Sequence, residues 1–179
     1  MGDYKNFKKV GEDVRIDPSS QIVRPELIEL GSHISIDMGV YFSTSAKIGD
    51  WIHIAPQVSI IGGGDSLLVM EHFSSLATGT RVICASDNFK EGFLNPFIPR
   101  KYRKVINETV TLKRYSSTGT NCSIMPGITM GEGSVLGANS VLTKDTEPWG
   151  VYVGAPAQRI STRDSKLILQ GAKELGYEF

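Results

Sequence analysis

An apolar residue at every sixth position is the feature that most constrains how this chain of 179 residues can fold. Side chains repeat every 3.6 residues around an α-helix and every second residue along a strand, so neither element alone has a period of six. The period is carried by Leu30, Ile36, Phe42, Ile48, Ile54 and Ile60, and again by Leu112, Thr118, Ile124, Met130, Leu136 and Leu142. A short period sustained over such a length is typical of a solenoid built from stacked repeats.

Each six-residue unit is predicted to be a short strand followed by a sharp corner. The residue after the apolar position is often glycine or another small residue, as at Gly31, Gly49, Gly119 and Gly137. Small residues let the chain turn tightly. Three units would close one triangular coil, and successive coils would hydrogen-bond as parallel strands about 4.8 Å apart. The prediction is an all-β fold, a parallel β-helix of about six coils, with the periodic apolar residues pointing inward.

Interruptions of the period show where the chain leaves the coils. A short insertion contains Gly62–Asp65, and a much longer loop covers residues 86–109. Long irregular excursions from a compact domain are usually functional. This loop also contains the basic cluster Arg100–Lys104, which is either a solvated segment or a site for a phosphorylated substrate.

The period stops after Pro156. Beyond it, Ser161 or Thr162 is predicted to cap a short C-terminal α-helix, because hydroxyl side chains satisfy the first free N–H groups of a helix. We therefore expect one β-helical domain over residues 1–160, with the long loop inserted, and a helix within 161–179.

Composition excludes several classes of protein. Lys plus Arg and Asp plus Glu both total 19, so the formal net charge is zero, whereas proteins that bind nucleic acid or membrane surfaces carry a basic excess. Met1–Asn6 is not followed by the apolar segment of a secretory signal, and no apolar run is long enough to span a membrane. Cys84 and Cys122 form neither a disulfide framework nor a metal-ligand pattern. We expect a soluble, cytoplasmic protein.

Three motifs near the C-terminal end of the repeat resemble a known family. They are IMPGITMG at Ile124–Gly131, GANSVLTKD at Gly137–Asp145 and VGAPA at Val153–Ala157. In order and spacing they resemble the hexapeptide-repeat acyltransferases, and most of all the galactoside-acetyltransferase-like enzymes and the nucleotide-aminosugar acyltransferases of O-antigen or capsule biosynthesis. The resemblance implies a left-handed β-helix, a homotrimer with sites between subunits, acetyl-CoA as co-substrate, a sugar acceptor and no metal.

The resemblance also implies a set of residues around coenzyme A. The positions matched by Thr120, Ala138, Thr143 and Lys144 line the coenzyme A channel in this family, with Lys144 near the phosphates. A basic residue often follows the third motif directly, but this chain has a glutamine there. Arg159 or Arg163 would then substitute as the phosphate contact.

The acceptor side lacks the residue that galactoside-type enzymes use as a base. Asp87 stands at the start of the long loop, in the place of their catalytic histidine. It either orients or deprotonates the acceptor itself, as a catalytic residue, or only forms a turn with Asn88. His53 is the best remaining histidine; repeat arithmetic places it at a corner, where it could meet Asp87 only between subunits. An amine is nucleophilic once neutral, whereas a hydroxyl needs a base, so the missing histidine favours N-acylation of an amino sugar. Asn88, Tyr102 and Arg103 are the candidate substrate-binding residues.

Three other functions compete with this prediction. O-acetylation of a sugar hydroxyl is the nearest. A zinc enzyme like the β-helical carbonic anhydrases would need three converging histidines, but His33, His53 and His72 occupy different places in their repeat units. A non-catalytic or ice-binding solenoid would have flat threonine rows and no long loop.

Overall fold

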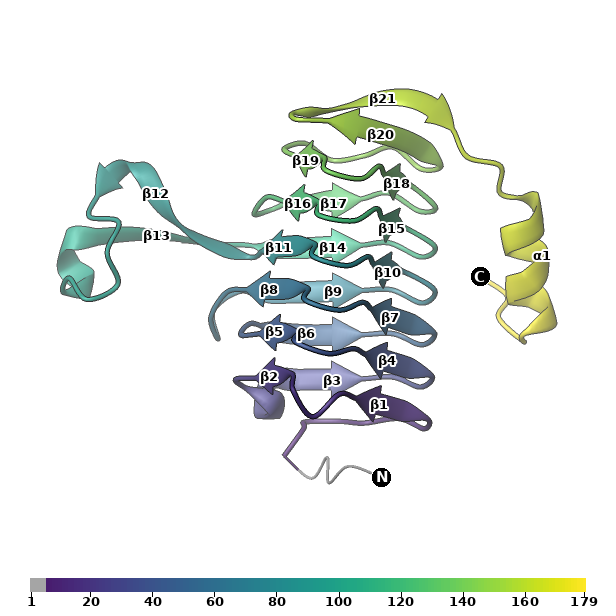
Figure 1. Ribbon diagram of the computed structural model, residues 1–179, viewed down its shortest axis with the longest axis horizontal. Coiled ribbons are helices and arrows are strands. Elements are labelled where there is room, and N and C mark those ends of the chain that lie inside the picture. Colours follow the sequence, from purple (N-terminus) through teal and green to yellow (C-terminus); the bar gives the residue numbers. More distant parts are fainter. Residues whose placement is uncertain (1–5) are drawn as a thin grey trace.

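Three sheets, parallel except for the last strand pair of one of them, form the walls of a triangular prism and contain most of the chain (Figure 1). The structure, a computed structural model, describes residues 6–179. Wall 1 consists of β1 (Val14–Ile16), β4 (Ile34–Ile36), β7 (Ile52–Ile54), β10 (Ser75–Leu76), β15 (Ser117–Thr118), β18 (Val135–Leu136), β20 (Gly150–Gly154) and β21 (Ala157–Thr162). Wall 2 consists of β2 (Gln21–Ile22), β5 (Tyr41–Phe42), β8 (Ser59–Ile61), β11 (Arg81–Ile83), β16 (Ser123–Ile124) and β19 (Val141–Leu142). Wall 3 consists of β3 (Ile28–Leu30), β6 (Ser45–Ile48), β9 (Leu67–Met70), β14 (Thr109–Leu112) and β17 (Thr129–Met130).

The chain winds as a left-handed parallel β-helix, as predicted. Up to β11, strands three apart in sequence are neighbours in one wall, so that β1 pairs in parallel with β4 and β4 with β7. In Figure 1 the nearer strands run leftwards and the fainter strands of wall 3 run rightwards while the chain climbs, which is a left-handed sense. The helix has about seven turns, one more than expected, because Gly150–Gly154 adds a turn that the six-residue period does not contain.

The periodic residues form the core. Eight of the periodic side chains that we expect to point inward are at most 5 % exposed, and they belong to one apolar cluster that runs the length of the prism. They are Leu30, Ile36, Phe42, Ile48, Ile54, Ile60, Leu136 and Leu142. The prediction that they point inward is therefore confirmed. Thr118 keeps the period although it is polar, because its hydroxyl accepts the N–H of Ala77 and lies 3.1 Å from the hydroxyl of Thr80.

The corner between walls 3 and 1 carries a stack of aromatic rings. One residue of each turn there adopts a left-handed backbone, with φ between 58° and 63° at His33, Trp51, Phe73, Tyr115 and Trp149. Successive ring centroids lie 4.1, 6.3, 5.5 and 6.0 Å apart, all with near-parallel planes. Stacking of this kind contributes about 0.5–1.5 kcal/mol per pair and offsets the strain of a positive φ. We call this stack the aromatic ladder.

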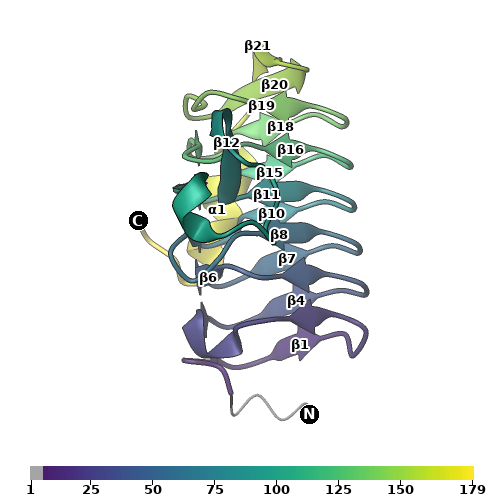
Figure 2. The same cartoon turned by 90° about the vertical axis from the view of Figure 1, so that its left-hand side faces the viewer.

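The long loop is an antiparallel hairpin and not the irregular segment that we predicted. Its strands, β12 (Ala85–Gly92) and β13 (Arg103–Asn107), are joined through a short 3-10 helix, η2 (Arg100–Tyr102). The hairpin leaves the prism at the corner between walls 2 and 3, after β11, and the chain returns to β14. It stands far out from the prism in Figure 1 and points toward the viewer in Figure 2. A similar corner lower down contains η1 (Pro25–Leu27).

The helix at the C-terminal end, α1 (Lys166–Glu174), begins later than predicted. Ser161 and Thr162 do not cap it, because both belong to β21, which pairs antiparallel with β20. The carboxylate of Asp164 accepts the N–H of Lys166 at the helix start instead. The helix runs beside the prism, separated from β21 by a short link (Figure 1).

The residues after α1 dock onto the aromatic ladder. Tyr177 donates its hydroxyl to Asp50 at 2.9 Å, and the rings of Tyr177 and Phe179 both contact His72. Burial of Asp50 would raise its pKa, but the N–H of Ser32 and the hydroxyl of Tyr177 outweigh burial and hold the pKa below its usual value. The tail therefore binds the charged form of this carboxylate.

No helix within residues 6–179 is long and apolar enough to cross a membrane. Residues 1–5 lie outside the part that the structure describes, and so does most of the segment Met1–Asn6 that we expected to carry no secretory signal.

Candidate functional site

His53 lies in the middle of β7, on the outer side of wall 1, and not at a corner as predicted. Its Nε2 is 2.7 Å from a carboxylate oxygen of Asp37, which follows β4 in the coil below. The hydroxyl of Ser35 donates to the other oxygen of the same carboxylate at 2.8 Å. Burial would raise the pKa of Asp37, but the hydrogen bonds from His53 and Ser35 outweigh it and lower the pKa.

The hairpin brings together the acidic and basic residues that we assigned to the acceptor. Nη2 of Arg103 in β13 donates to the carboxylate of Asp87 in β12 at 2.9 Å. Both side chains are less than one fifth exposed, at 18 % and 16 %. Nε of Arg103 is buried without a hydrogen-bond partner among the described residues. Asp87 is therefore held by a fixed positive charge on the neighbouring strand.

Asn88 and Tyr102 lie on the same hairpin and differ in exposure. The side-chain oxygen of Asn88 accepts the N–H of Lys90, which fixes its orientation at the edge of a cavity of about 430 Å³. That cavity is lined by Asn88, Glu91, Arg100, Arg103, Lys104, Val105 and Ile106. Tyr102 is half exposed, with the ammonium of Lys101 4.8 Å from its ring centre. Arg103 thus bonds Asp87 and lines the same cavity as Asn88, whereas Tyr102 does not line that cavity.

Asp87 and His53 lie on different parts of the prism. His53 is on the outer side of wall 1, whereas the hairpin leaves the corner between walls 2 and 3. The structure of one chain therefore does not bring these two candidates together, and their contact between subunits stays a prediction.

Thr120 and Ala138 lie one above the other at the corner between walls 1 and 2. Each follows a glycine, and a Cβ on Gly119 would lie 2.5 Å from the backbone nitrogen of Ala138. Both Thr120 and Ala138 are exposed. Small residues stacked at this corner keep main-chain groups close to the surface, and we call this column of small residues the groove.

The other residues assigned to coenzyme A lie elsewhere in the same chain. Thr143 and Lys144 are exposed and follow β19, at the opposite edge of wall 2 from Ala138. Arg163 is turned to the corner between walls 3 and 1, where its Nη1 donates to the carbonyl of Tyr115 at 2.8 Å and to that of Gly133 at 3.2 Å. Burial lowers the pKa of Arg163. Arg163 therefore links two coils through hydrogen bonds to their main chain. Within one chain it is not placed to bind the phosphates of coenzyme A at the corner between walls 1 and 2.

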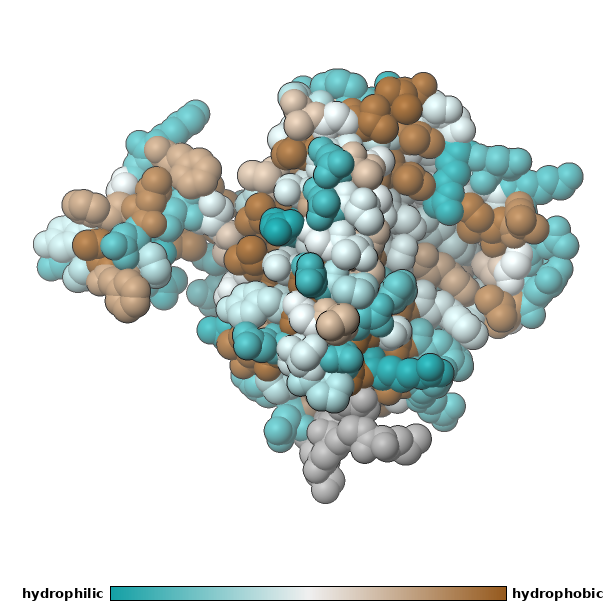
Figure 3. Space-filling model, viewed as in Figure 1, coloured by the Kyte–Doolittle hydropathy of each residue, from teal (hydrophilic) through white to brown (hydrophobic). Residues whose placement is uncertain are grey.

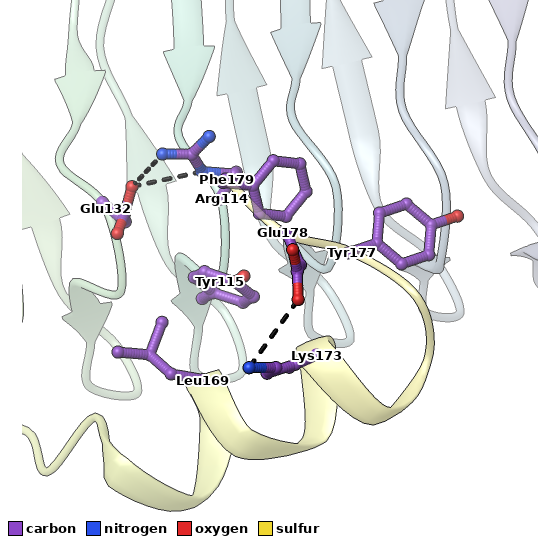
Figure 4. Close-up of a pocket in the computed structure, with 8 residues that line it drawn as sticks. All are labelled: Arg114, Tyr115, Glu132, Leu169, Lys173, Tyr177, Glu178 and Phe179. Carbon is purple, nitrogen blue, oxygen red and sulfur yellow. Dashed lines mark hydrogen bonds and ion pairs between the residues drawn. The ribbon is translucent and has the colours of Figure 1, made fainter.

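A cavity that sequence reasoning did not predict lies between α1 and the aromatic ladder (Figure 4). It measures about 380 Å³ and is lined by Arg114, Tyr115, Glu132, Leu169, Lys173, Tyr177, Glu178 and Phe179. Its two cations have partners inside it, since Arg114 bonds Glu132 at 2.6 Å and Lys173 lies 3.7 Å from Glu178. The cavity therefore offers no spare positive charge for phosphate. Its signal in the sequence was an aromatic residue three positions after several periodic residues, as at Trp51, Phe73 and Tyr115.

Neither metal ligation nor a thiol nucleophile is evident. Within residues 6–179, no group of three His, Cys, Asp or Glu side chains lies close enough to hold a metal ion. His33 stacks on Trp51 instead, and His72 accepts the N–H of Asp50. Cys84 is fully buried, and burial raises the pKa of its thiol to about 12. Burial also raises the pKa of Cys122, so both thiols are protonated and inaccessible.

Comparison with known proteins adds to this geometry. No protein-family model matches the chain. The chain is 30 % identical over 166 residues to a dTDP-4-amino-4,6-dideoxy-D-glucose acyltransferase of Escherichia coli, a match that covers 90 % of this chain and 85 % of that protein. It is 29 % identical over 121 residues to WbbJ of Escherichia coli K12, a putative lipopolysaccharide biosynthesis O-acetyl transferase; the match covers 68 % of this chain and 59 % of WbbJ.

Solved structures of N-acyltransferases are also similar to this chain. AntD, an N-acyltransferase from Bacillus cereus, superposes with a TM-score of 0.91 at 30 % identity, covering 96 % of this chain and 92 % of AntD. That crystal structure holds dTDP and 3-hydroxybutyryl-CoA. An AntD variant with the same TM-score, 31 % identical to this chain, holds dTDP-4-amino-4,6-dideoxyglucose and coenzyme A.

Proposed function

Because this chain belongs to the hexapeptide-repeat acyltransferases, we propose that it transfers an acyl group from acetyl-CoA to the amine of a nucleotide-linked amino sugar. The observation that carries the proposal is the similarity along 90 % of the chain to an enzyme named for a dTDP-linked 4-amino sugar. Asp87, where galactoside-type enzymes have a histidine, supports an acceptor that needs little help to lose a proton. A product of this kind fits O-antigen or capsule biosynthesis. A cytoplasmic location is part of the proposal.

Coenzyme A is proposed to lie along the groove at the corner between walls 1 and 2, against Thr120 and Ala138. Small side chains there leave main-chain groups within reach of the amides of the pantetheine arm. Thr143 and Lys144 would line the groove from a neighbouring subunit, since they are exposed on the far edge of wall 2. Arg163 already donates to two carbonyls, so the proposal moves the phosphate contact from Arg163 to Lys144.

A homotrimer is part of the proposal, and the hairpin is its main support. Phe97 and Phe89 are 96 % and 77 % exposed, and Phe93 and Leu94 are also exposed. Apolar surface gathers on this projecting hairpin in Figure 3. An exposed apolar patch on a hairpin without cover is typical of a subunit contact, and a closed ring would repeat it. Such a ring is the arrangement that could bring Asp87 of one subunit to His53 of the next.

The reaction is proposed to proceed by direct attack in a ternary complex. The amine attacks the thioester carbonyl, main-chain N–H groups stabilise the oxyanion, and the coenzyme A thiolate leaves. A covalent acyl-enzyme is not expected, because Cys84 and Cys122 are buried and protonated. Arg103 would hold Asp87 as a carboxylate that orients the amine, with Asn88 and Tyr102 beside it.

O-acetylation of a sugar hydroxyl is the second candidate, and the similarity to WbbJ favours it. One assay separates the two. Thiol release from acetyl-CoA and from 3-hydroxybutyryl-CoA is followed with dTDP-linked 4-amino sugars and with their 4-hydroxy counterparts. Release with the amines alone supports N-acylation, and release with the hydroxyls alone supports the second candidate. Release with neither acceptor refutes both.

A variant tests the groove in the same assay. Ala138→Trp should fill the groove and raise the KM for acetyl-CoA, whereas Lys47→Trp, on the exposed side of wall 3, should leave the KM unchanged. Equal KM values for the two variants would remove coenzyme A from this corner.

A further inference from the structure

The groove at the corner between walls 1 and 2 ends at a carboxylate. Going down the prism, the first residue after each wall 1 strand is Gly137, Gly119, Ala77, Ala55 and then Asp37. Their stacking is fixed by main-chain bonds, since the N–H of Gly119 donates to the coil above and that of Asp37 donates to the carbonyl of Ile54. The four small residues above Asp37 span four coil spacings, roughly 19 Å. Asp37 is the first residue in this column with a long polar side chain.

Asp37 is held from two sides at the foot of the groove. Ser35 donates to one carboxylate oxygen at 2.8 Å, and Nε2 of His53 lies 2.7 Å from the other. Asp37 is only 31 % exposed, whereas the ring of His53 is 55 % exposed. Ser35 and His53 are also direct neighbours across the β4–β7 pairing. The ring is therefore anchored at one nitrogen while its body remains open to a ligand.

The pair fixes the tautomer of His53. A carboxylate only accepts hydrogen bonds, so Nε2 must carry the proton in this contact. In the neutral ring Nδ1 then has a lone pair, and no residue among 6–179 bonds to it. An imidazole whose tautomer and orientation are set by a carboxylate is the usual arrangement of a histidine base. The other charged residues that line the same hollow as Asp37 are Arg15 and Asp17, both from the coil below.

We propose that Asp37, braced by Ser35, is a positioning residue that holds His53 with Nδ1 ready to take the proton of the attacking amine at the foot of the groove. This inference rests on the proposed function. In the step, a C–N bond forms between the amine and the thioester carbon, and a proton of the amine passes to Nδ1. The C–S bond then breaks, the sulfur leaves with the electron pair, and it takes the proton from the imidazolium. Asp37 touches neither substrate.

The chain contains a matched control for this pair. Asp13 and His33 form a second carboxylate–imidazole contact, at 3.2 Å. However, His33 lies at the corner between walls 3 and 1, stacked on Trp51 at 4.1 Å. Asp13→Asn therefore removes the same kind of partner from a histidine that does not face the groove.

The test combines kinetics with the tautomer of His53. The full-length protein with ¹⁵N-labelled histidine gives ring-nitrogen shifts that distinguish Nε2–H from Nδ1–H, and its three histidines are assigned by substitution. We expect the Nε2–H form in the wild type and a shift toward Nδ1–H in Asp37→Asn. In acetyl transfer to the dTDP-linked amine, Asp37→Asn should lower kcat by about 10- to 100-fold, part of the effect of a general base. The KM for acetyl-CoA should stay within about twofold, and Ser35→Ala should cause a smaller loss in kcat.

Double substitution tests whether the two residues act as a unit. Adding Asp37→Asn to His53→Ala should cause no further loss. Asp13→Asn should match the wild type in kcat. If Asp37→Asn or His53→Ala keeps the wild-type kcat, this inference is overturned while the proposed function stands. An Nδ1–H tautomer of His53 in the wild type would have the same consequence. Absence of acyl transfer by the wild type to any acceptor would overturn the proposed function and the catalytic use of the pair with it.

Discussion

The ion pair between Asp87 and Arg103 makes Asp87→Asn an informative substitution. Exposed pairs contribute about 0–1 kcal/mol, and breaking a fully buried pair costs about 3–5 kcal/mol. With side chains 16 % and 18 % exposed, this pair lies nearer the buried limit. We therefore expect a cost of about 2–3 kcal/mol, which corresponds to a factor of roughly 100 in an equilibrium constant. The asparagine leaves the Arg103 guanidinium without a counter-charge.

This cost should appear in the hairpin and not in the prism. The hairpin stands out from the coils, so opening it leaves the stacked walls intact. If only the ordered hairpin binds the acceptor, the KM for the sugar rises by up to roughly 100-fold while kcat at saturation changes little. If Asp87 instead takes the proton, kcat itself falls by about 10²–10⁴-fold. Steady-state kinetics with saturating acetyl-CoA separate the two cases.

Hydrogen exchange of the hairpin amides checks the structural part directly. Protection should fall in Asp87→Asn and recover when Arg103→Met is added, because the second substitution removes the unpaired charge. Glu147→Gln is the control, since Glu147 pairs with Arg159 at 2.7 Å but both side chains are well exposed. Equal protection of the hairpin in the wild type and Asp87→Asn would refute the claim that this ion pair orders it.

Three further predictions concern packing, thiol chemistry and pH. Gly119→Ala should destabilise the protein by about 1–3 kcal/mol in urea unfolding, because its Cβ would lie 2.5 Å from the backbone of the next coil. Gly63→Ala, with nothing within 4 Å, should be neutral, and equal midpoints would contradict the close stacking. Cys84 should resist iodoacetamide at pH 8 until the protein is unfolded, as mass spectrometry would show; fast labelling of the native protein would contradict its burial. The depressed pKa of Asp50 means that Tyr177 docks on a carboxylate, so tail docking is fully present above about pH 4 and is lost as the pH falls further. Proteolysis of the tail should accelerate over that range, and a pH-independent rate would be evidence against the contact.

The sequence predicted the prism because its determinants are local. A six-residue period decides which side chains enter the core, and Phe42 or Leu136 is found there without knowledge of any distant residue. The Asp37–His53 contact can also be predicted from the sequence. Two residues 16 apart lie in adjacent coils when three units make a turn, so coil arithmetic could have paired them.

Other parts of the site had no such signal. Arg163 bonds to main-chain carbonyls of Tyr115 and Gly133, and a carbonyl is present at every position, so nothing in the sequence marks these as partners. The sequence does not predict the hairpin, because its strands are largely exposed and lack alternating apolar residues. Without a buried face, the usual period of a strand does not appear in the sequence.

The hydrogen bond from Tyr177 to Asp50 joins residues 127 apart, whereas the parallel strand pairings of the prism link only adjacent coils. A solenoid with only nearest-neighbour contacts can fray from either end, one repeat at a time. Here the last residues of the chain hold the third coil, so the upper coils cannot peel away without first releasing the tail. The contact links the C-terminal end of the chain back to an early coil. Unfolding from the C-terminal end should therefore be more cooperative than in a repeat protein with nearest-neighbour contacts alone.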